Sequence, residues 1–553
     1  MIRYSPLSIL IFFLFTLFSG VAQESIAEKD FMVRYFSDRL ELAFDKAKLP
    51  STLKVIDVFS NNEIAIEKTT NPNYFIINSI KPSQFFKIEY TLKDAKTSTL
   101  STVIASKSAS SGTINVYFNH PVDTSFSQTQ AAVNLADTLD NMLISYIDNC
   151  VATLDIAIYN SYSPSAAAGI AGAINAAYAR GVQVRVIYDG STSSVMIPLL
   201  NSAIPALASP TTSSYSIMHN KFVIIDANCN NPFLSYVWTG STNWTVAQID
   251  GPDKNNAIVI QDQTLAAAYT LEFEEMWGSS TAQPNTTNSK FGQYKTDNTP
   301  HNFIIGGRTV ESYFSPSDGT TSKIISSINS ANSDIEIAVM NFTRTDISSA
   351  IFNKYAAGVT NINVLVDSSN PTSNQISNLQ AGLLPNHAVV DAATGIMHHK
   401  FMVVDNFDNN SDPQVLTGSH NWSTSAETKN DENTLIVHDA NIANQYYQAF
   451  ANVYQAAGGI IINPLANSEN QLEDFKNLKI IPNPHNGVFQ LFSSVPIDSL
   501  DIKIYDVLGK LVQEKHFTEF FNSLIDMTSE MAGFYVMEVN HDGNSFHYKI
   551  VKN

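Results

Sequence analysis

Apolar runs typical of strands alternate with helix-like stretches through the central part of the chain. Residues 154–160 (LDIAIYN) precede an alanine-rich stretch at 166–180, and a second apolar run follows at 179–189. The same order recurs with the apolar runs at 333–341 and 356–367. Strands that are apolar throughout are buried on both faces, and strand–helix–strand order is typical of βαβ units. The pattern therefore predicts an α/β region with a largely parallel sheet.

Both flanks show the alternation of apolar and polar residues that is typical of half-buried strands. Residues 23–111 carry such runs at 53–59 and 85–90, and a Ser/Thr-rich stretch at 97–111 is interpreted as a link. Residues 478–553 alternate in the same way around turn-forming sequences such as Pro-Asn-Pro. We expect a small β-rich domain before the centre, with a spacer or adhesion role, and a small β-sandwich after it.

The centre of the chain is an internal repeat. Residues 112–290 and 300–460 contain the same short motifs in the same order and at nearly the same spacing. Two such halves pack about a pseudo-twofold axis, as in a symmetric dimer, so a site at the axis receives each motif twice. We therefore predict a monomer with an internal pseudo-dimer. Its fold class is α/β, with two pseudo-twofold-related βαβ halves flanked by small all-β N- and C-terminal domains. Each half ends on a helical stretch whose aromatic residues are expected to face the core: Tyr269, Phe273, Trp277 and Tyr446, Phe450, Tyr454.

Residues 1–22 have the pattern of an export signal. Arg3 precedes an apolar core from Leu7 to Phe18, and small residues up to Ala22 suit cleavage. An N-terminal membrane anchor is the alternative, but the apolar core is shorter than the ~20 residues that span a bilayer. We expect the signal to be removed and the protein to be exported in a water-soluble form.

The composition narrows the class of protein. The chain has 553 residues, with 32 Lys and Arg against 51 Asp and Glu, and a net charge of −19. Its 44% hydrophobic and 15% charged residues are typical of a globular protein. The acidic balance argues against a non-specific nucleic-acid binder but does not exclude a nuclease with a locally basic cleft. Cys150 and Cys229 are too few for a disulfide framework or a Cys-rich zinc site.

Each half carries the pattern His-x-Lys-x₄-Asp followed by Gly-Ser-x-Asn-Trp. On a strand, a His and a Lys two residues apart point to the same face, so an imidazole and an ammonium share one patch. The Gly-Ser turn offers backbone and hydroxyl donors, and the Asn adds an amide donor. Two copies of both motifs are hard to explain without a function. The candidate catalytic residues are His219, Lys221, Asp226, Ser241 and Asn243 in the first half, and His398, Lys400, Asp405, Ser419 and Asn421 in the second.

This set of side chains suits a phosphodiester substrate. The cations and amides hold the non-bridging oxygens, one histidine attacks phosphorus, and the other protonates the leaving oxygen. A metal site is disfavoured, because a lysine beside each histidine repels a cation and the aspartates do not form a compact ligand cluster. We therefore predict neither a metal nor another cofactor.

The duplicated HxKx₄D and GSxNW motifs, within about residues 112–460, resemble those of the phospholipase D superfamily of phosphodiesterases and phosphatidyltransferases. The resemblance implies two-step chemistry through a phosphohistidine without a metal, with water or an alcohol as the second acceptor. It also implies that an acidic residue downstream of each motif orients the histidine of the opposite half. Glu432 matches that position in the second half, whereas Asn255 occupies it in the first.

This difference predicts unequal roles for the two histidines. A carboxylate makes its imidazole a better base and nucleophile. If Glu432 reaches across to His219, then His219 is the nucleophile and His398 is the general acid. His399, the next residue of the strand, is expected to point away from the site and to be structural.

The final segment, residues 478–553, carries a second resemblance. Its Pro-Asn-Pro turn at 482–484, its DVLGK sequence at 506–510 and its closing strand resemble the C-terminal sorting domain of Bacteroidota type IX secretion cargo. The resemblance implies the type IX secretion machinery as a partner, and a secreted or cell-surface location beyond both membranes. A carbohydrate-binding or adhesion module is the alternative.

Three functions remain. The leading prediction is a secreted phospholipase-D-like phosphodiesterase that hydrolyses phospholipid head groups. A DNA or RNA endonuclease of the same superfamily is the alternative, although the acidic composition makes a basic groove less expected. A surface adhesin with a degenerate catalytic core is the third, and the intact motifs of both halves argue against it. The loops at 191–216 and 367–393, where specificity is expected to lie, contain no readable code.

Overall fold

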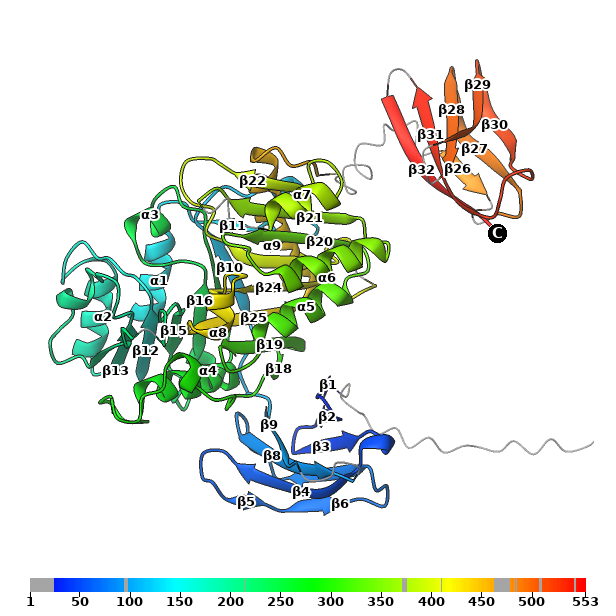
Figure 1. Cartoon of the computed structure of the whole chain (residues 1–553). Helices are drawn as coiled ribbons and strands as arrows, with labels where there is room; N and C mark the ends of the chain where they lie inside the picture. Colours follow the sequence, from blue (N-terminus) through cyan, green and yellow to red (C-terminus); the bar gives the residue numbers. More distant parts are fainter. Residues whose placement is uncertain are drawn as a thin grey trace, which may run out of the picture. The chain divides into compact units, whose positions relative to one another are not determined.

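The computed structural model separates into two compact units, the first ending at Ile461 and the second running from Ile462 to Asn553 (Figure 1). The export signal predicted for residues 1–22 lies outside the described residues. The structure describes residues 24–93, 98–212, 214–369, 375–408, 410–461, 478–481, 483, 485–506, 510–541 and 544–553.

Two antiparallel sheets form the N-terminal part of the first unit, in agreement with the predicted all-β region. Their strand orders are β1-β2-β3-β7-β6 and β5-β4-β8-β9. Alternate side chains such as Val33, Leu42 and Ile88 are fully buried in a shared core, because successive residues of a strand point to opposite faces. The strands are β1 (Glu24–Ala27), β2 (Phe31–Tyr35), β3 (Arg39–Phe44), β4 (Pro50–Asp57), β5 (Glu63–Ile64), β6 (Ile66–Lys68), β7 (Tyr74–Asn78), β8 (Phe85–Leu92) and β9 (Leu100–Ala105).

The prediction of a Ser/Thr-rich link at 97–111 is wrong for its central part. Strand β9 lies there and pairs with β8 in an antiparallel register. Val103 and Ile104 are buried whereas Ser101 is exposed. Successive side chains of a strand point to opposite faces of the sheet, so polar Ser101 faces solvent while the apolar end of β9 completes the core. Composition alone obscures that arrangement.

Each half of the repeat is built on an eight-stranded sheet, and the two strand orders correspond from the second strand onward. The orders are β11-β10-β17-β16-β15-β12-β13-β14 and β18-β19-β25-β24-β23-β20-β21-β22. The first sheet contains β10 (Ile114–Phe118), β11 (Val133–Asn134), β12 (Thr153–Ile158), β13 (Gln183–Tyr188), β14 (Ala206–Ala208), β15 (Lys221–Ile225), β16 (Tyr236–Gly240) and β17 (Asn256–Gln261). The second contains β18 (Asn302–Ile305), β19 (Arg308–Ser315), β20 (Asp334–Val339), β21 (Asn361–Asp367), β22 (Ala388–Asp391), β23 (Lys400–Val404), β24 (Gln414–Gly418) and β25 (Glu432–His438).

Both sheets are mixed, so the prediction of a largely parallel sheet is wrong. Strands β12, β13 and β14 are parallel, whereas β15, β16 and β17 pair antiparallel with their neighbours. The second sheet repeats this division. The central strands β12, β15, β16 and β17 are buried on both faces, so apolar runs indicate burial but carry no information on strand direction.

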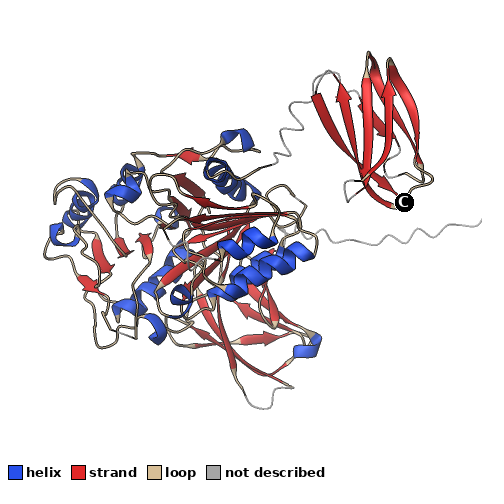
Figure 2. Cartoon of the chain, turned by 45° about the horizontal axis from the view of Figure 1, so that its top comes forward, coloured by secondary structure: helices blue, strands red, loops and turns tan. Residues whose placement is uncertain are grey.

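Helices cover both faces of the two sheets. Figure 2 shows α5 and α6 together over one face of the second sheet, and α1 and α2 pack as the corresponding pair in the first half. The helices are α1 (Leu139–Asp148), α2 (Gly169–Ala179), α3 (Val246–Ile249), α4 (Gln263–Trp277), α5 (Thr320–Ser330), α6 (Thr345–Ala356), α7 (Ile376–Gly382), α8 (Thr424–Thr428) and α9 (Ala440–Ala456).

The two halves share one apolar core around α4 and α9. The six aromatic residues predicted to face the core lie on these helices and are fully buried. Tyr269 of α4 contacts Phe314 of the second half with ring centroids 5.0 Å apart, and Tyr446 of α9 contacts Phe118 of the first half at 5.3 Å. Each half therefore completes its core with a helix that also packs on the other half, which fixes the halves as a pseudo-dimer.

The second unit is a β-sandwich, as predicted. Sheets of order β26-β27-β30 and β29-β28-β31-β32 enclose one apolar core. No helix among the residues that the structure describes has the length and apolar character needed to cross a membrane. The strands are β26 (Leu478–Ile481), β27 (Val488–Ile497), β28 (Leu500–Asp506), β29 (Leu511–Phe517), β30 (Phe520–Asp526), β31 (Gly533–His541) and β32 (Asn544–Lys552).

Candidate active site

The two histidine motifs enter the site through short backbone pairings that join the halves. Met218, before β15, forms a parallel bridge with Asp431, and Met397, before β23, forms the matching bridge with Lys254. The His219 amide donates to the Asp431 carbonyl at 2.9 Å, and the His398 amide makes the equivalent bond to Lys254, also at 2.9 Å. Each histidine therefore lies just before its strand, beside the segment that leads into β25 or β17 of the other half.

Each imidazole is oriented by a side chain of the opposite half. His219 Nδ1 lies 2.7 Å from Glu432 Oε2, and His398 Nδ1 lies 2.9 Å from Asn255 Oδ1. The predicted contact from Glu432 to His219 is therefore present. Because each oxygen accepts from an Nδ1–H, the Nε2 atoms of both rings remain available for chemistry.

The two motif serines support these orienting side chains. Ser419 Oγ donates to Glu432 Oε2 at 2.6 Å, and Ser241 Oγ donates to Asn255 Oδ1 at 3.1 Å. Both hydroxyl oxygens accept a backbone N–H in turn, at 3.1 Å. These serines were predicted as catalytic residues with hydroxyl donors; in the structure their single hydroxyl protons serve the residues that hold the imidazoles.

The glycine before each serine is required by the close approach of two strands. Gly240 has φ 146° and Gly418 has φ 156°. A Cβ on Gly240 would lie 2.3 Å from the Asn256 carbonyl oxygen, and one on Gly418 would lie 2.2 Å from that of Asn433. Only glycine avoids this clash, so the Gly-Ser pair seats the serine against the strand that carries the orienting residue.

The two lysines are buried, and the ammonium group of each lies beside the histidine that precedes it. Lys221 Nζ donates to the carbonyl of His219 at 2.6 Å, and Lys400 Nζ donates to that of His398 at 2.7 Å. Burial lowers the pKa of Lys221 to about 7, and burial together with the Lys221 charge lowers that of Lys400 well below its usual range. An anion bound between them would stabilise both charged forms.

The two motif asparagines have amide groups available to a ligand. The Oδ1 atoms of Asn243 and Asn421 are buried without a hydrogen-bond partner among the described residues. Asn243 is 5% exposed and uses its backbone amide to contact Gln248. A buried acceptor left unpaired is costly unless a donor of a ligand or water satisfies it, which fits a place in a binding site. The Nδ2 group of the same amide is the part that can donate to a substrate oxygen.

Asp226 and Asp405 lie at the other end of the histidine strands, roughly 20 Å along the chain from the imidazoles at 3.3 Å per residue. Asp226 accepts the backbone amides of Val151, Ala152 and Thr153 at 2.6–3.2 Å. Asp405 accepts equivalent amides of the corresponding loop in the second half. Their prediction as catalytic residues is therefore corrected, because these carboxylates fix loops and do not reach the site.

A matched pair of aspartates near the site was missing from the predicted set. Asp189 Oδ2 accepts the Met218 amide, and Asp367 Oδ2 accepts the Met397 amide, each at 2.8 Å. Each carboxylate thus holds the residue just before a histidine. The matching ends of the apolar runs, VIYD and VLVD, were the available signal, but their function depends on strands that meet only in the fold.

His399 points away from the site, as expected for the next residue of a strand. Its Nε2 lies 2.8 Å from His120 Nε2, and its Nδ1 lies 3.0 Å from Asn256 Nδ2. Burial lowers the pKa of His120 to about 4 and that of His399 well below its usual range. The pair is therefore neutral at ordinary pH and links the two halves beneath the site.

Burial also controls the charge of the site histidines. It lowers the pKa of His219 to about 4 although Glu432 acts in the opposite direction, and it lowers the pKa of His398 well below its usual range. Burial raises the pKa of Glu432, but His219 and Lys221 outweigh it and bring that pKa to about 2. At neutral pH the site therefore contains a neutral His219 beside a carboxylate.

A metal-ligand cluster within the described ranges does not involve these histidines. Asp297, His301 and Asp318 place one ligand atom each within 4.8 Å of one another. His301 Nε2 contacts Asp297 at 3.0 Å while its Nδ1 contacts the Ser312 carbonyl, so ion pairing and hydrogen bonding already occupy the ring.

Two imidazoles are held from opposite halves, and a buried lysine bonds to the carbonyl of each histidine, an arrangement that suits phosphoryl transfer. Residues 143–277 and 324–454 match the family described as "Cardiolipin synthase, PLD-like domain". Residues 479–553 match the "Secretion system C-terminal sorting domain". The central region of the chain belongs to the phospholipase D superfamily of phosphodiesterases, and the C-terminal region is a type IX secretion sorting domain.

Characterised relatives match part of this central region. Mitochondrial cardiolipin hydrolase of Drosophila melanogaster is 33% identical over 152 residues, which are 24% of this chain and 57% of that protein. Phospholipase D of Rickettsia bellii is 27% identical over 165 residues, 28% of this chain and 78% of that one. The crystal structure of the phospholipase D family member Nuc from Salmonella typhimurium is 26% identical, covers 27% of this chain and 95% of its own, and gives a TM-score of 0.24.

Proposed function

We propose that the protein is an exported, metal-independent phosphodiesterase that hydrolyses a phospholipid head group through a phosphohistidine. The observation that carries the proposal is the unequal cross-half pairing, in which Glu432 orients His219 and Asn255 orients His398. A carboxylate partner favours attack by His219, whereas a neutral amide leaves His398 to transfer protons.

In the first step, His219 Nε2 attacks phosphorus while the bond to the leaving oxygen breaks and His398 donates a proton to that oxygen. In the second step, the neutral His398 takes a proton from water, the water oxygen attacks phosphorus, and the bond to His219 breaks. His219 returns to its neutral form and His398 to its protonated form, so no proton or electron is lost.

The lysines and asparagines bind the non-bridging oxygens in this scheme. Lys221 and Lys400 are buried at the two histidines, and in this scheme the Nδ2 groups of Asn243 and Asn421, not their unpartnered Oδ1 atoms, donate to the substrate oxygens. An anionic substrate between two lysines also favours the protonated form of His398, which the empty, buried site disfavours. The negative charge of the bound substrate thus stabilises the protonated His398 that acts as the general acid.

The names of the relatives support a lipid substrate. The Drosophila relative is named a cardiolipin hydrolase and the Rickettsia relative a phospholipase D. The net charge of −19 gives the chain no excess of basic residues for a nucleic-acid backbone. The sorting domain supports release or display outside the cell, where the type IX secretion machinery is the expected partner.

Activity of the full chain in EDTA on phosphatidylcholine vesicles and on plasmid DNA tests the proposal, with His219→Ala and His398→Ala as controls. We expect head-group release that both substitutions abolish. Cleavage of DNA alone, lost in both variants, would replace the lipid by a nucleic acid as the substrate. Loss of activity in EDTA would overturn the metal-independent mechanism.

A further inference from the structure

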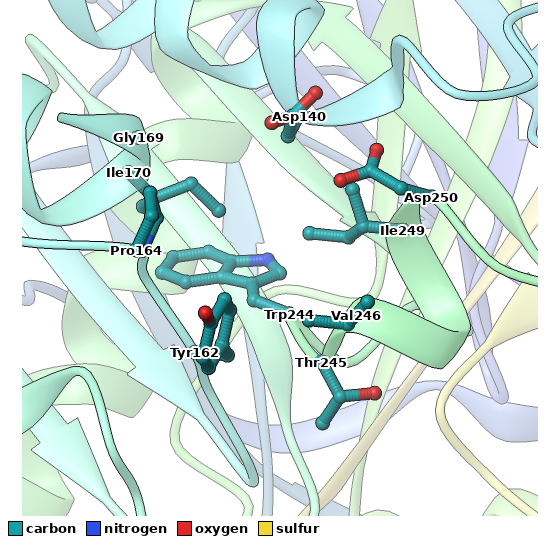
Figure 3. Close-up of a pocket in the computed structure, with 10 residues that line it drawn as sticks. All are labelled: Asp140, Tyr162, Pro164, Gly169, Ile170, Trp244, Thr245, Val246, Ile249 and Asp250. Atoms are coloured by element: carbon teal, nitrogen blue, oxygen red, sulfur yellow. The ribbon is translucent and has the colours of Figure 1, made fainter.

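Beside the GSTNW motif of the first half, the structure contains a pocket of about 180 Å³ that the phosphoryl-transfer scheme does not use. Trp244, Ile170 and Ile249 supply its apolar surface, and Asp140 and Asp250 stand at its rim (Figure 3). It lies between α1, α2 and α3, with Tyr162 along one side. The pocket therefore combines an aromatic and aliphatic interior with negative charge.

The two carboxylates have no cation to neutralise them. No ion pair involves Asp140 or Asp250 among the described residues, and the side chain of Asp140 accepts only the neighbouring Asn141 amide. Burial raises the pKa of Asp250, and the charges of Asp140 and Asp137 raise it further. Two like charges held near each other without a counter-ion favour a bound cation.

The indole of Trp244 supplies a second, independent signal. Trp244 is only 2% exposed, and its Nε1 has no hydrogen-bond partner within the described part of the chain. Figure 3 shows this nitrogen on the side of the ring that faces Ile249 and the two carboxylates. An N–H at the wall of a pocket can donate to an acceptor oxygen of a ligand, and the surrounding apolar side chains provide no competing acceptor.

The second half shows how the pocket arises. The isolated bridge between Ser161 and Trp244 corresponds to the bridge between Phe342 and Trp422. The Phe342 ring packs edge-on against Trp422 with centroids 4.9 Å apart, and Trp422 is fully buried. Serine at the matching position has no ring to pack against Trp244, so the two tryptophans have different surroundings: Trp244 lines the pocket, whereas Trp422 Nε1 is buried without a partner among the described residues.

We infer that the Trp244 pocket binds a small organic cation of the amino-alcohol type, with its ammonium group between Asp140 and Asp250 and an adjacent oxygen accepting from Trp244 Nε1–H. Aromatic side chains beside carboxylates are a favourable environment for an alkylated ammonium group. The oxygen requirement distinguishes this ligand from a simple cation. The inference does not depend on the proposed phosphodiesterase activity, because it concerns binding alone.

Calorimetric titration of the full-length His219→Ala variant with three probes tests the inference without turnover. Choline has both charge and oxygen, tetramethylammonium lacks the oxygen, and 3,3-dimethylbutan-1-ol lacks the charge. We expect choline to bind at least about fivefold more tightly than either of the other probes. Equal binding of all three, or no binding of choline, would overturn the inference.

Three substitutions, introduced into the same background, assign the effect to the pocket. Asp250→Asn should weaken both cations, whereas Trp244→Phe should remove the advantage of choline over tetramethylammonium while leaving the charge preference. Asp148→Asn, which removes an exposed acid from the end of the same helix as Asp140, should change neither. An equal loss in Asp148→Asn would show that only the general negative field attracts the cation.

A further experiment distinguishes a phospholipid head group from a free amino alcohol as the ligand of the Trp244 pocket. Phosphatidylcholine and phosphatidylglycerol vesicles are sedimented with the inactive His219→Ala protein, with and without free choline. Preference for phosphatidylcholine that choline abolishes assigns the pocket to a lipid head group, whereas binding of free choline without vesicle preference assigns it to a soluble amino alcohol. Vesicle binding that ignores choline and Asp250→Asn would contradict the pocket as the binding site.

Discussion

The two halves of the site have almost the same geometry but opposite electrostatic character. His219 and His398 precede matching strands, and each donates from Nδ1 to a residue of the opposite half. The lysine two residues after each histidine donates to the backbone carbonyl of that histidine. The orienting residue is a carboxylate for His219 and an amide for His398. The residue before it is also inverted, with Asp431 in one half and Lys254 in the other.

This difference teaches how a duplicated fold can support two chemical roles. The same backbone pairing, the same glycine and the same serine position the orienting side chain in each half, so geometry is retained. One substitution at the end of that chain of contacts changes the charge beside an imidazole. A nearby carboxylate makes an imidazole a better nucleophile, whereas the imidazole that acts as proton donor does not need a carboxylate partner.

Replacing either histidine is the strongest test of whether the two halves have different catalytic roles. His219→Asn and His398→Asn should each lower kcat by at least about 10³-fold, since each step needs both rings. Only His398→Asn retains the nucleophile, so samples of that variant quenched in alkaline denaturant, where a phosphohistidine is stable, should contain a phosphoenzyme. A phosphoenzyme found in His219→Asn instead would reverse the two roles.

Removing the carboxylate should have the next largest effect. Glu432→Gln keeps the acceptor oxygen but makes the two halves electrostatically alike, and we expect kcat to fall by about 10²-fold. Rapid-quench measurement should place the loss in formation of the phosphoenzyme. Ser419→Ala, which keeps the carboxylate but removes the hydroxyl that supports it and accepts the Asn433 amide, is the matched control and should lose less.

Adding a carboxylate beside His398 gives the second half the charge that Glu432 provides in the first pairing. In Asn255→Asp, a negative charge beside His398 stabilises its protonated form and raises its pKa. The limb of the kcat/KM profile that requires protonated His398 should therefore move to higher pH, with a change in rate of about tenfold or less. An unchanged profile would show that His398 is not the proton donor.

The charge of the site should also appear in the pH dependence of stability. Burial lowers the pKa of His219 from 6.5 to about 4, so between these values the unfolded chain binds a proton that the folded protein does not. This contribution is present above pH 6.5 and is lost as the pH falls toward 4. Differential scanning calorimetry should show a shallower fall in Tm across that range for His219→Ala; a profile identical to that of the unsubstituted protein would contradict the buried neutral state.

The smallest effect on catalysis is expected at the aspartates of the two motifs. Asp226→Ala leaves three backbone amides without their acceptor, which should destabilise the protein by about 2–4 kcal/mol. Well below the new Tm, kcat should stay within about twofold of the original, because the carboxylate is roughly 20 Å along the strand from His219. Denaturation and kinetics on the same sample separate these effects, and a large loss of kcat in folded protein would return Asp226 to the active site.

The sequence alone determined the repeat, its two copies of each motif and the unequal residues at positions 432 and 255. It also determined which aromatic residues face the core, because helical spacing and apolar character are local properties. Strand direction was not determined, since a strand buried on both faces has the same composition in a parallel or an antiparallel sheet.

Only the tertiary structure decided what each motif residue contacts. His and Asp of one motif lie at opposite ends of a strand, whereas His219 and Glu432, far apart in sequence, are 2.7 Å apart. The hydroxyl groups of Ser241 and Ser419 could donate hydrogen bonds to a phosphate, yet close strand packing directs them to the orienting side chains. Such contacts depend on how two halves pack across an axis, and that packing arises from a shared core whose partners no single segment of the sequence contains.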